Sequence, residues 1–323
     1  MGRAKEAAKD GRGRRWRRLG TWECATAAAG LLTSLLLLFP GLVPNGGPRL
    51  GSLLETFLPW LGLAVLPLVP VALVRRSAVA VGAALLPVAA WTVAYGGTFF
   101  ADENAAYDLT VLQHNVSDEN RDVAGTARAL VRERADLVAL QEVTDDTREA
   151  YRTALADEYP HHAVVGTVGL WSRHPLVDAR PVDVKPQGIP DGWNRGLRAT
   201  ARTPHGEVAV YVAHLPSVRV SATGFTTERR DESAGLLAAA IRAEEVERLV
   251  LLGDLNSTTR DRGLDPVHSQ LNAPKDPFAF SWPASRPLAR IDQVLVRSGQ
   301  VTQVSTLERT GSDHLPVRAR IAF

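Results

Sequence analysis

Three long apolar runs near the N-terminus constrain this chain more than any other feature. The first run is CATAAAGLLTSLLLLFPGLV (24–43), which contains no charged residue. The second, FLPWLGLAVLPLVPVALV (57–74), and the third, AVAVGAALLPVAAWTVAYGG (78–97), are also uncharged. A helix rises about 1.5 Å per residue, so roughly 20 residues cross the roughly 30 Å hydrocarbon core of a bilayer. We therefore expect a membrane segment over 23–100 with three transmembrane helices, at about 24–43, 55–74 and 78–97.

Two other interpretations of these runs are buried helices of a soluble core and, for the first run, a signal peptide. A signal peptide has a shorter apolar stretch and is followed by a polar mature chain, whereas here two more apolar runs follow. Several prolines, which disfavour helices in water but are tolerated in membrane helices, lie within the second and third runs: Pro59, Pro67, Pro70 and Pro87. The pattern therefore favours membrane helices.

The basic residues around the apolar runs predict the orientation of the chain. The segment 1–22 holds eight Lys and Arg residues, whereas the loop after the first run holds only Arg49 and the next loop holds Arg75 and Arg76. A basic tail alone could also bind nucleic acid, but here an apolar run follows it directly. Because basic loops stay in the cytoplasm, we expect a cytoplasmic tail at 1–22 and a multi-pass protein of the cell membrane, with 101–323 outside the cytoplasm.

The remainder of the chain alternates between strand-like and helix-like patterns, which predicts an α/β domain over 101–323. The expected strands lie at 109–115, 136–143, 162–172, 207–215, 248–256, 290–296 and 315–323. Helical spacing of apolar residues predicts helices at 123–134 and 229–244. The segment 257–289, rich in Pro, Ser and Asp, is typical of a long surface loop.

Polar residues of types that serve in catalysis or metal binding lie at the ends of several predicted strands. They are Asn115, Glu142, His214, Asp254, Asn256, Asp292, Asp313 and His314. Each one alone has an ordinary explanation as a turn residue, a cap, an ion-pair partner or a satisfied core histidine. Their joint occurrence is less ordinary, because loops at strand ends are where α/β folds present functional groups. We therefore expect them to gather in one site.

The residue types in this set favour metal-assisted phosphoryl chemistry. Carboxylate and amide oxygens suit Mg²⁺, or Mn²⁺, and histidines beside aspartates suit proton transfer and the stabilisation of phosphoryl charge. The single cysteine excludes a Cys-rich zinc site, and the chain has no G-x-S-x-G elbow, P-loop or G-x-G-x-x-G motif. Residues 101–323 carry 26 Lys and Arg against 31 Asp and Glu, which argues against, without excluding, a surface for long nucleic acid.

In order along the chain, the motifs QHN, LQEV, AHL, GDLN, RIDQV and SDH resemble those of the endonuclease/exonuclease/phosphatase family. The resemblance spans 108–323 and implies a DNase I-like four-layer α/β sandwich. It implies metal ligation by three residues: Glu142, Asn115 and Asp313. It implies catalytic roles for five residues: His214, Asp254, Asn256, Asp292 and His314. Arg195 and Arg198 are weaker candidates for binding the substrate phosphate, since surface salt bridges explain them equally well.

Three membrane helices followed by such a domain also resemble the VanJ-type actinobacterial membrane proteins associated with teicoplanin resistance. Together these resemblances imply a membrane-anchored, Mg²⁺-dependent phosphohydrolase acting on a lipid or lipid-linked cell-wall phosphoester or pyrophosphate, with no protein partner. Two alternatives remain open at this point. One is a membrane-tethered extracellular nuclease, and the other is an inactive binding or sensing module.

Overall fold

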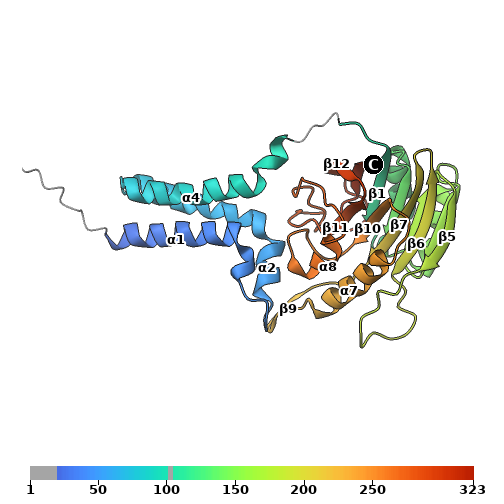
Figure 1. The fold of residues 1–323 in the computed structure, drawn as a ribbon, viewed down its shortest axis with the longest axis horizontal. Coiled ribbons are helices and arrows are strands. Elements are labelled where there is room, and N and C mark those ends of the chain that lie inside the picture. The colour runs from blue at the N-terminus through green and yellow to red at the C-terminus, as the bar shows by residue number, and fades with distance from the viewer. Residues whose placement is uncertain (1–19, 101–104) are drawn as a thin grey trace, which may run out of the picture.

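The computed structural model describes residues 20–100 and 105–323, so most of the expected basic tail lies outside the described residues. An elongated set of N-terminal helices projects from one side of an α/β sandwich (Figure 1). The N-terminal helices and 3₁₀ segments are α1 (Thr21–Leu38), η1 (Pro40–Leu42), α2 (Leu50–Thr56), η2 (Leu58–Ala64), α3 (Val65–Val74), α4 (Ala78–Tyr95) and η3 (Gly96–Phe100).

Two helices of the described chain are long and apolar enough to cross a membrane: Thr21–Leu38 and Ala78–Phe99. They lie beside each other, and the contact is close because Gly30 has no side chain. A Cβ added there would lie 2.2 Å from the carbonyl oxygen of Ala83. Small residues at such crossings let membrane helices approach closely.

The second expected span, 55–74, is not one continuous helix. The chain forms two helical pieces, Leu50–Thr56 and Leu58–Val74, that meet at an angle of 79°. Pro59 lies in the first turn after the break, and proline lacks the N–H needed to continue a helix from the preceding turn. The described chain therefore contains two candidate spans, or three if the bent pair counts as one.

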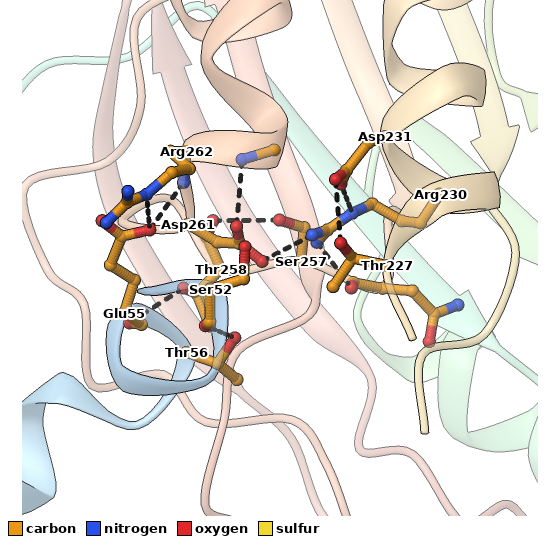
Figure 2. A network of polar contacts seen from close by, with 12 residues as sticks. Ser52, Glu55, Thr56, Thr227, Arg230, Asp231, Ser257, Thr258, Asp261 and Arg262 are labelled. Atoms are coloured by element: carbon orange, nitrogen blue, oxygen red, sulfur yellow. Dashed lines mark hydrogen bonds and ion pairs between the residues drawn. The ribbon is translucent and has the colours of Figure 1, made fainter. Parts of the chain in front are cut away.

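The N-terminal helices are joined to the sandwich by a buried ion pair. Arg262 lies 2.6 Å from Glu55, whose side chain is 4% exposed (Figure 2). Its Nη1 and Nη2 also donate to the carbonyl oxygens of Val43 and Pro40. These two carbonyls belong to the first residue of η1 and to the residue that follows it, Val43. Arg262 therefore holds α2 and the segment after α1 against the loop that follows the GDLN motif.

The sandwich contains two main sheets within residues 105–323. One has the strand order β12-β13-β1-β2-β4-β3 and the other β11-β10-β7-β6-β5. The strands of the first are β1 (Leu109–Asn115), β2 (Leu137–Gln141), β3 (His161–Val165), β4 (Val168–Ser172), β12 (Gln300–Thr306) and β13 (Val317–Ala322). The strands of the second are β5 (Leu176–Pro181), β6 (Gly196–Thr203), β7 (Gly206–His214), β10 (Leu249–Asp254) and β11 (Asp292–Arg297). A small hairpin pairs β8 (Val220–Ser221) with β9 (Gly224–Phe225).

The two main sheets pack face to face, and helices cover their outer faces. Aliphatic side chains from both sheets, such as Val111 and Val250, form the central core. Helices α5 (Val123–Arg132) and α6 (Asp145–Leu155) cover the first sheet, while α7 (Glu228–Arg242) and α8 (Asp265–His268) cover the second. This helix–sheet–sheet–helix order confirms the expected DNase I-like α/β architecture.

The expected strands are found with small shifts at their ends, and the run 162–172 forms the β3–β4 hairpin instead of one strand. Strands β5, β6, β8, β9 and β12 and helices α6 and α8 were not expected. The prediction of a surface loop over 257–289 is wrong in part, because this segment contains η4 (Arg262–Leu264) and α8 and buries Leu264 and Val267 against the second sheet. In β6 the residues alternate between the two faces, and its charged Arg198 is buried, which hides the usual apolar pattern.

Candidate active site

The strand register brings most of the predicted site residues to one edge of the sandwich. Strands β7 and β10 run parallel with His214 opposite Asp254, and β10 pairs with β11 so that Asp254 lies opposite Asp292. In the other sheet, β1 ends at Asn115 beside the end of β2, directly before Glu142. Side chains from the two sheets therefore meet between the ends of their central strands.

An amide joins the two carboxylates at the centre of the site. Asn115 donates through Nδ2 to Glu142 Oε1 and to Asp254 Oδ2, both at 3.0 Å. Its Oδ1 accepts a hydrogen bond from the backbone N–H of Ser117, at 3.0 Å. In this orientation Asn115 holds the carboxylates in place, and its oxygen does not face them. The structure therefore favours a positioning role over the direct metal ligation predicted for Asn115.

Glu142 is more accessible than Asp254 and Asp292, which are buried. Its side chain is 25% exposed, and Oε2 accepts a hydrogen bond from the backbone N–H of Asp118 at 3.0 Å. The Glu142 backbone has a φ of 61°, a left-handed conformation that costs a non-glycine residue about 1–3 kcal/mol. Such strain is common where the fold must aim one side chain, and here it directs the carboxylate toward the cavity described below.

His314 forms a buried pair with Asp292. Its Nδ1 lies 2.8 Å from Asp292 Oδ2, and Asp292 Oδ1 accepts a hydrogen bond from Gln113 Nε2 at 2.5 Å. Burial disfavours a charged ring, but the carboxylates of Asp292 and Asp254 outweigh it and raise the pKa of His314 to about 10. The charge of the adjacent Asp313 adds to this effect. His314 is therefore an imidazolium whose Nε2 lies 3.7 Å from Asp254 Oδ2.

His214, in contrast to His314, is neutral. Burial, together with the nearby Arg195 and His314, lowers the pKa of His214 well below its usual value, so the ring is neutral. Its Nε2 lies 3.8 Å from Glu142 Oε1 and 3.7 Å from Asp254 Oδ2. The site therefore contains one neutral and one protonated imidazole, on opposite sides of Asp254.

Asp254 is almost fully buried, and burial raises its pKa. Burial raises the pKa of Asp254 to about 7, against the lowering effect of His314 and of its hydrogen bonds. Its Oδ1 accepts a hydrogen bond from the backbone N–H of Asn256 at 3.0 Å. A carboxylate with a pKa near neutrality can both accept and release a proton, which suits general acid–base catalysis.

The loop after Asp254 is held by a network that reaches the N-terminal helices. Arg230 donates to the backbone oxygen of Asn256 at 3.1 Å and lies 2.7 Å from Asp261 (Figure 2). Asp261 directly precedes Arg262, the partner of Glu55. The position of the GDLN loop is therefore linked through polar contacts to the way the N-terminal helices pack.

The two predicted phosphate-binding arginines have different environments. Arg195 Nη1 lies 3.2 Å from His214 Nδ1, so it is part of the site. Arg198, three residues later on the opposite side of the sheet, forms a bidentate pair with Glu244 at 2.8 and 2.9 Å and is 5% exposed. The prediction of Arg198 as a phosphate ligand is wrong on this geometry, because its guanidinium is enclosed beneath α7.

The acidic groups fit a divalent cation in two places. Within the described residues, the ligand atoms of Asp254, Asp292 and His314 lie within 4.8 Å of one another. His314 is protonated and paired with Asp292, so its ring has no free lone pair for a cation and this trio resembles a proton-transfer group. Glu142, which is more accessible and faces Asp254 across Asn115, is better suited to hold Mg²⁺.

The site opens into a cavity of about 580 Å³, here called the catalytic cavity. Six of the predicted site residues line it: Asn115, Glu142, Asp254, Asn256, Asp313 and His314. Its other walls come from segments that sequence reasoning did not assign to the site. They are Thr56 and Phe57 at the break after α2, the β8–β9 hairpin with Val220 and Phe225, and Trp282.

Gln113 is a further residue that was not predicted. It precedes His114 and Asn115 in the QHN motif, and its amide fixes the carboxylate that orients His314. Its place two residues before Asn115, on the same face of β1, is a signal that could have identified it.

The chain belongs to the Endonuclease/Exonuclease/phosphatase family, whose model matches residues 112–314, more than half of the chain. Among curated proteins, none matches the sequence. Sphingomyelinase C from Streptomyces griseocarneus is 20% identical with a TM-score of 0.51, and the match covers 68% of this chain and 100% of that one. A mannosyl-6-phosphatase from Bacteroides thetaiotaomicron is 18% identical with a TM-score of 0.53, covering 67% and 100%. D. rerio TDP2 complexed with single-strand DNA product is 16% identical with a TM-score of 0.55, covering 67% and 99%.

These likenesses confirm the fold, and the family assigns the chain to the phosphoesterase class of hydrolases. The N-terminal helices lie outside the matched residues 112–314.

Proposed function

We propose that this chain is a membrane-anchored, metal-dependent phosphohydrolase that acts on a lipid or lipid-linked cell-wall phosphoester or pyrophosphate outside the cytoplasm. One observation carries the proposal. The catalytic cavity is lined on one side by Glu142, Asp254 and His314, and on another by Thr56 and Phe57 from the helical membrane segment. A substrate that enters this cavity therefore contacts both the phosphoesterase residues and the residues nearest the bilayer.

The extracytoplasmic placement rests on the basic tail and on the few basic residues in the first loop. If the chain crossed the membrane twice, α4 would end on the cytoplasmic side and the sandwich would lie in the cytoplasm. Three crossings place the sandwich outside. In this proposal the second crossing is therefore made by Leu58–Val74, while Leu50–Thr56 stays against the sandwich, where Glu55 pairs with Arg262.

Glu142 would hold the cation, with Asp313 nearby on the cavity wall, and Mg²⁺ is the ion that we propose. A beta toxin variant from Staphylococcus aureus, which is 14% identical with a TM-score of 0.52, was solved with bound magnesium ions. A bound divalent cation stabilises the negative charge that develops on the phosphoryl oxygens.

The protein groups supply proton transfer and further charge stabilisation. Asp254, with a pKa of about 7, would take the proton of the attacking water as general base and return it to the leaving oxygen as the phosphoester bond breaks. Protonated His314, oriented by Asp292, donates from Nε2 to a phosphoryl oxygen. Arg195 contributes a second positive charge, from the side of His214.

The experiment is a substrate screen on the full chain purified in detergent. Phosphate release would be measured from undecaprenyl-linked phosphates, phospholipids and plasmid DNA, with and without Mg²⁺. The proposal predicts Mg²⁺-dependent release from a lipid phosphate, abolished by His314→Ala. Cleavage of DNA alone, with the steep salt dependence of phosphate contacts, would instead support the tethered nuclease.

A role in protection against glycopeptide antibiotics is part of the same proposal. It follows from the sequence resemblance to VanJ-type proteins together with a substrate drawn from cell-wall lipids. Expression in a susceptible actinobacterium would test it. The minimum inhibitory concentration of teicoplanin should rise with the wild-type chain and stay at the vector level with the His314→Ala variant.

A further inference from the structure

A second cavity, of about 330 Å³, lies between the N-terminal helices and the sandwich, and it is here called the apolar groove. Its walls include Pro59, Trp60 and Leu63 from η2, Val88 from α4, and Phe278 and Phe280 from the sandwich. All of these side chains are apolar, apart from the indole N–H of tryptophan. The groove therefore suits hydrocarbon and offers little to a charged or strongly polar ligand.

The apolar groove and the catalytic cavity have no lining residue in common, but two stretches of chain contribute to both. On one side, Phe57 lines the catalytic cavity and Pro59 and Trp60 line the groove. On the other side, Phe280 lines the groove and Trp282 lines the catalytic cavity. Two short stretches of chain therefore border both spaces.

Contacts between these two stretches hold the groove in shape. Trp60 donates through Nε1 to the backbone oxygen of Leu288 at 2.7 Å, and its ring stacks on Phe280 with centroids 5.4 Å apart. Trp91 of α4 stacks on Phe278 with centroids 5.6 Å apart and donates to the backbone oxygen of Pro59 at 3.0 Å. The aromatic walls are thus fixed by the sandwich as well as by the helices.

We propose that the apolar groove binds the hydrocarbon chain of the substrate while its phosphate lies in the catalytic cavity. This inference rests on the proposed function, and it adds the place where the hydrocarbon chain of the substrate binds. Three features favour a lipid chain as occupant: the uncharged lining, the location at the helices expected to contact the bilayer, and the shared border with the catalytic residues. A chain leaving the bilayer along α4 would pass Val88 and lie against the stacked pair of Trp60 and Phe280, with its phosphate end toward Trp282 and the catalytic cavity.

The groove acts chiefly by positioning the substrate. A chain that moves from lipid tails into an apolar groove gains little hydrophobic free energy, because both surroundings are apolar. The rigid aromatic walls hold the hydrocarbon chain in one path and so orient the phosphate toward Glu142 and His314. The chain length of the substrate should therefore matter for turnover, and blocking the groove should affect long chains most.

A matched pair of variants on α4 tests this inference. Val88→Trp places a large ring in the groove, whereas Val93→Trp makes the same exchange on the same helix at a side chain that is 77% exposed and does not line it. The substrates are hexadecyl phosphate and butyl phosphate, presented in mixed micelles with Mg²⁺. We expect Val88→Trp to lower the ratio of kcat/KM for hexadecyl over butyl phosphate about tenfold or more. We expect Val93→Trp to keep the wild-type ratio.

An unchanged ratio in Val88→Trp, or an equal fall in both variants, would overturn the inference. Leu63→Trp, on the opposite wall of the groove, gives a second blocking variant should Val88→Trp fold poorly.

A binding measurement separates this inference from the proposed function. Hexadecyl phosphate carrying a diazirine near the middle of its chain would be photo-crosslinked to the full protein, and the labelled peptides mapped by mass spectrometry. Labels on 59–65 and 278–280 in the wild type and in Val93→Trp, but not in Val88→Trp, support the groove even if no substrate is hydrolysed. Labels spread evenly over α1 and α4 in all three proteins would refute it while leaving the hydrolytic proposal standing.

Discussion

Replacing Arg198 with alanine distinguishes a structural arginine from a substrate-binding one. Arg198 forms two hydrogen bonds to Glu244 and a third, at 2.6 Å, to the hydroxyl of Thr200. The side chains of Arg198 and Glu244 are 5% and 3% exposed. Removing one member of a buried ion pair leaves the other charged and unpaired, which typically costs about 3–5 kcal/mol of unfolding free energy.

The proton affinity of Glu244 gives a second measure of the same pair. Burial acts to raise it, but hydrogen bonds from Arg198, Val246 and Tyr211 lower the pKa of Glu244 from 4.5 to about 2. That difference corresponds to about 3 kcal/mol for the whole environment of Glu244, of which the contacts with Arg198 are one part. Because the folded-state pKa is depressed, this stability is fully present above the unfolded-state pKa, about 4.3, and is lost as the pH falls through about 2. At pH 7 the whole amount is available to be lost.

The assay compares thermal unfolding and kinetics of Arg198→Ala with those of Arg202→Ala. Arg202 lies on the same strand in an exposed pair with Glu207, whose side chains are 59% and 55% exposed, so its loss should change the unfolding free energy by less than about 0.5 kcal/mol. For a domain of this size, about 3 kcal/mol lowers the Tm by roughly 6–12 °C. We expect that fall in Arg198→Ala, with KM unchanged below the transition. A wild-type Tm with a raised KM would refute the structural role and restore the phosphate contact.

Three further predictions concern the site and its link to the N-terminal helices. Asp292→Asn removes the carboxylate that helps to raise the His314 pKa to about 10, so the alkaline limb of the kcat/KM–pH profile should move to lower pH; an unmoved limb would argue against the pair. EDTA should abolish phosphate release and Mg²⁺ should restore it, whereas EDTA-resistant turnover would exclude a required cation. Arg262→Ala should lower the Tm more than Arg262→Ala combined with Glu55→Ala, because the single variant strands a buried carboxylate; a double variant whose loss equals the sum of the Arg262→Ala and Glu55→Ala losses would show no coupling.

The sandwich could be foreseen from sequence because its site residues follow regular strands. Alternating apolar residues placed β1, β7 and β10, and the motifs at their ends placed Asn115, His214 and Asp254 on one edge. The parallel register of β7 with β10 then fixes which side chains face each other. The strands themselves are local features that an apolar pattern specifies well, whereas the β7–β10 register joins residues 40 positions apart and comes from the fold.

Other features depend on contacts that no local pattern encodes. Arg195 and Arg198 are three residues apart and look alike in sequence, yet one lies beside His214 and the other beneath α7 beside Glu244. The break after Thr56 also follows from context, since prolines inside an apolar run fit either a kinked span or an interruption. The contribution of Phe57 to the catalytic cavity arises only when the N-terminal helices pack against the sandwich.

The most direct test of the central claim is the rate of phosphate release from hexadecyl phosphate by the full chain, with Mg²⁺ present, for the wild type and for Glu142→Gln. Glutamine keeps the shape of the side chain and removes the charge that we assign to holding the cation. We predict Mg²⁺-dependent release by the wild type and a loss of at least about a hundredfold in the variant, since metal-site changes commonly cost 10–100-fold or more. Equal Mg²⁺-dependent rates for the two proteins would contradict the account.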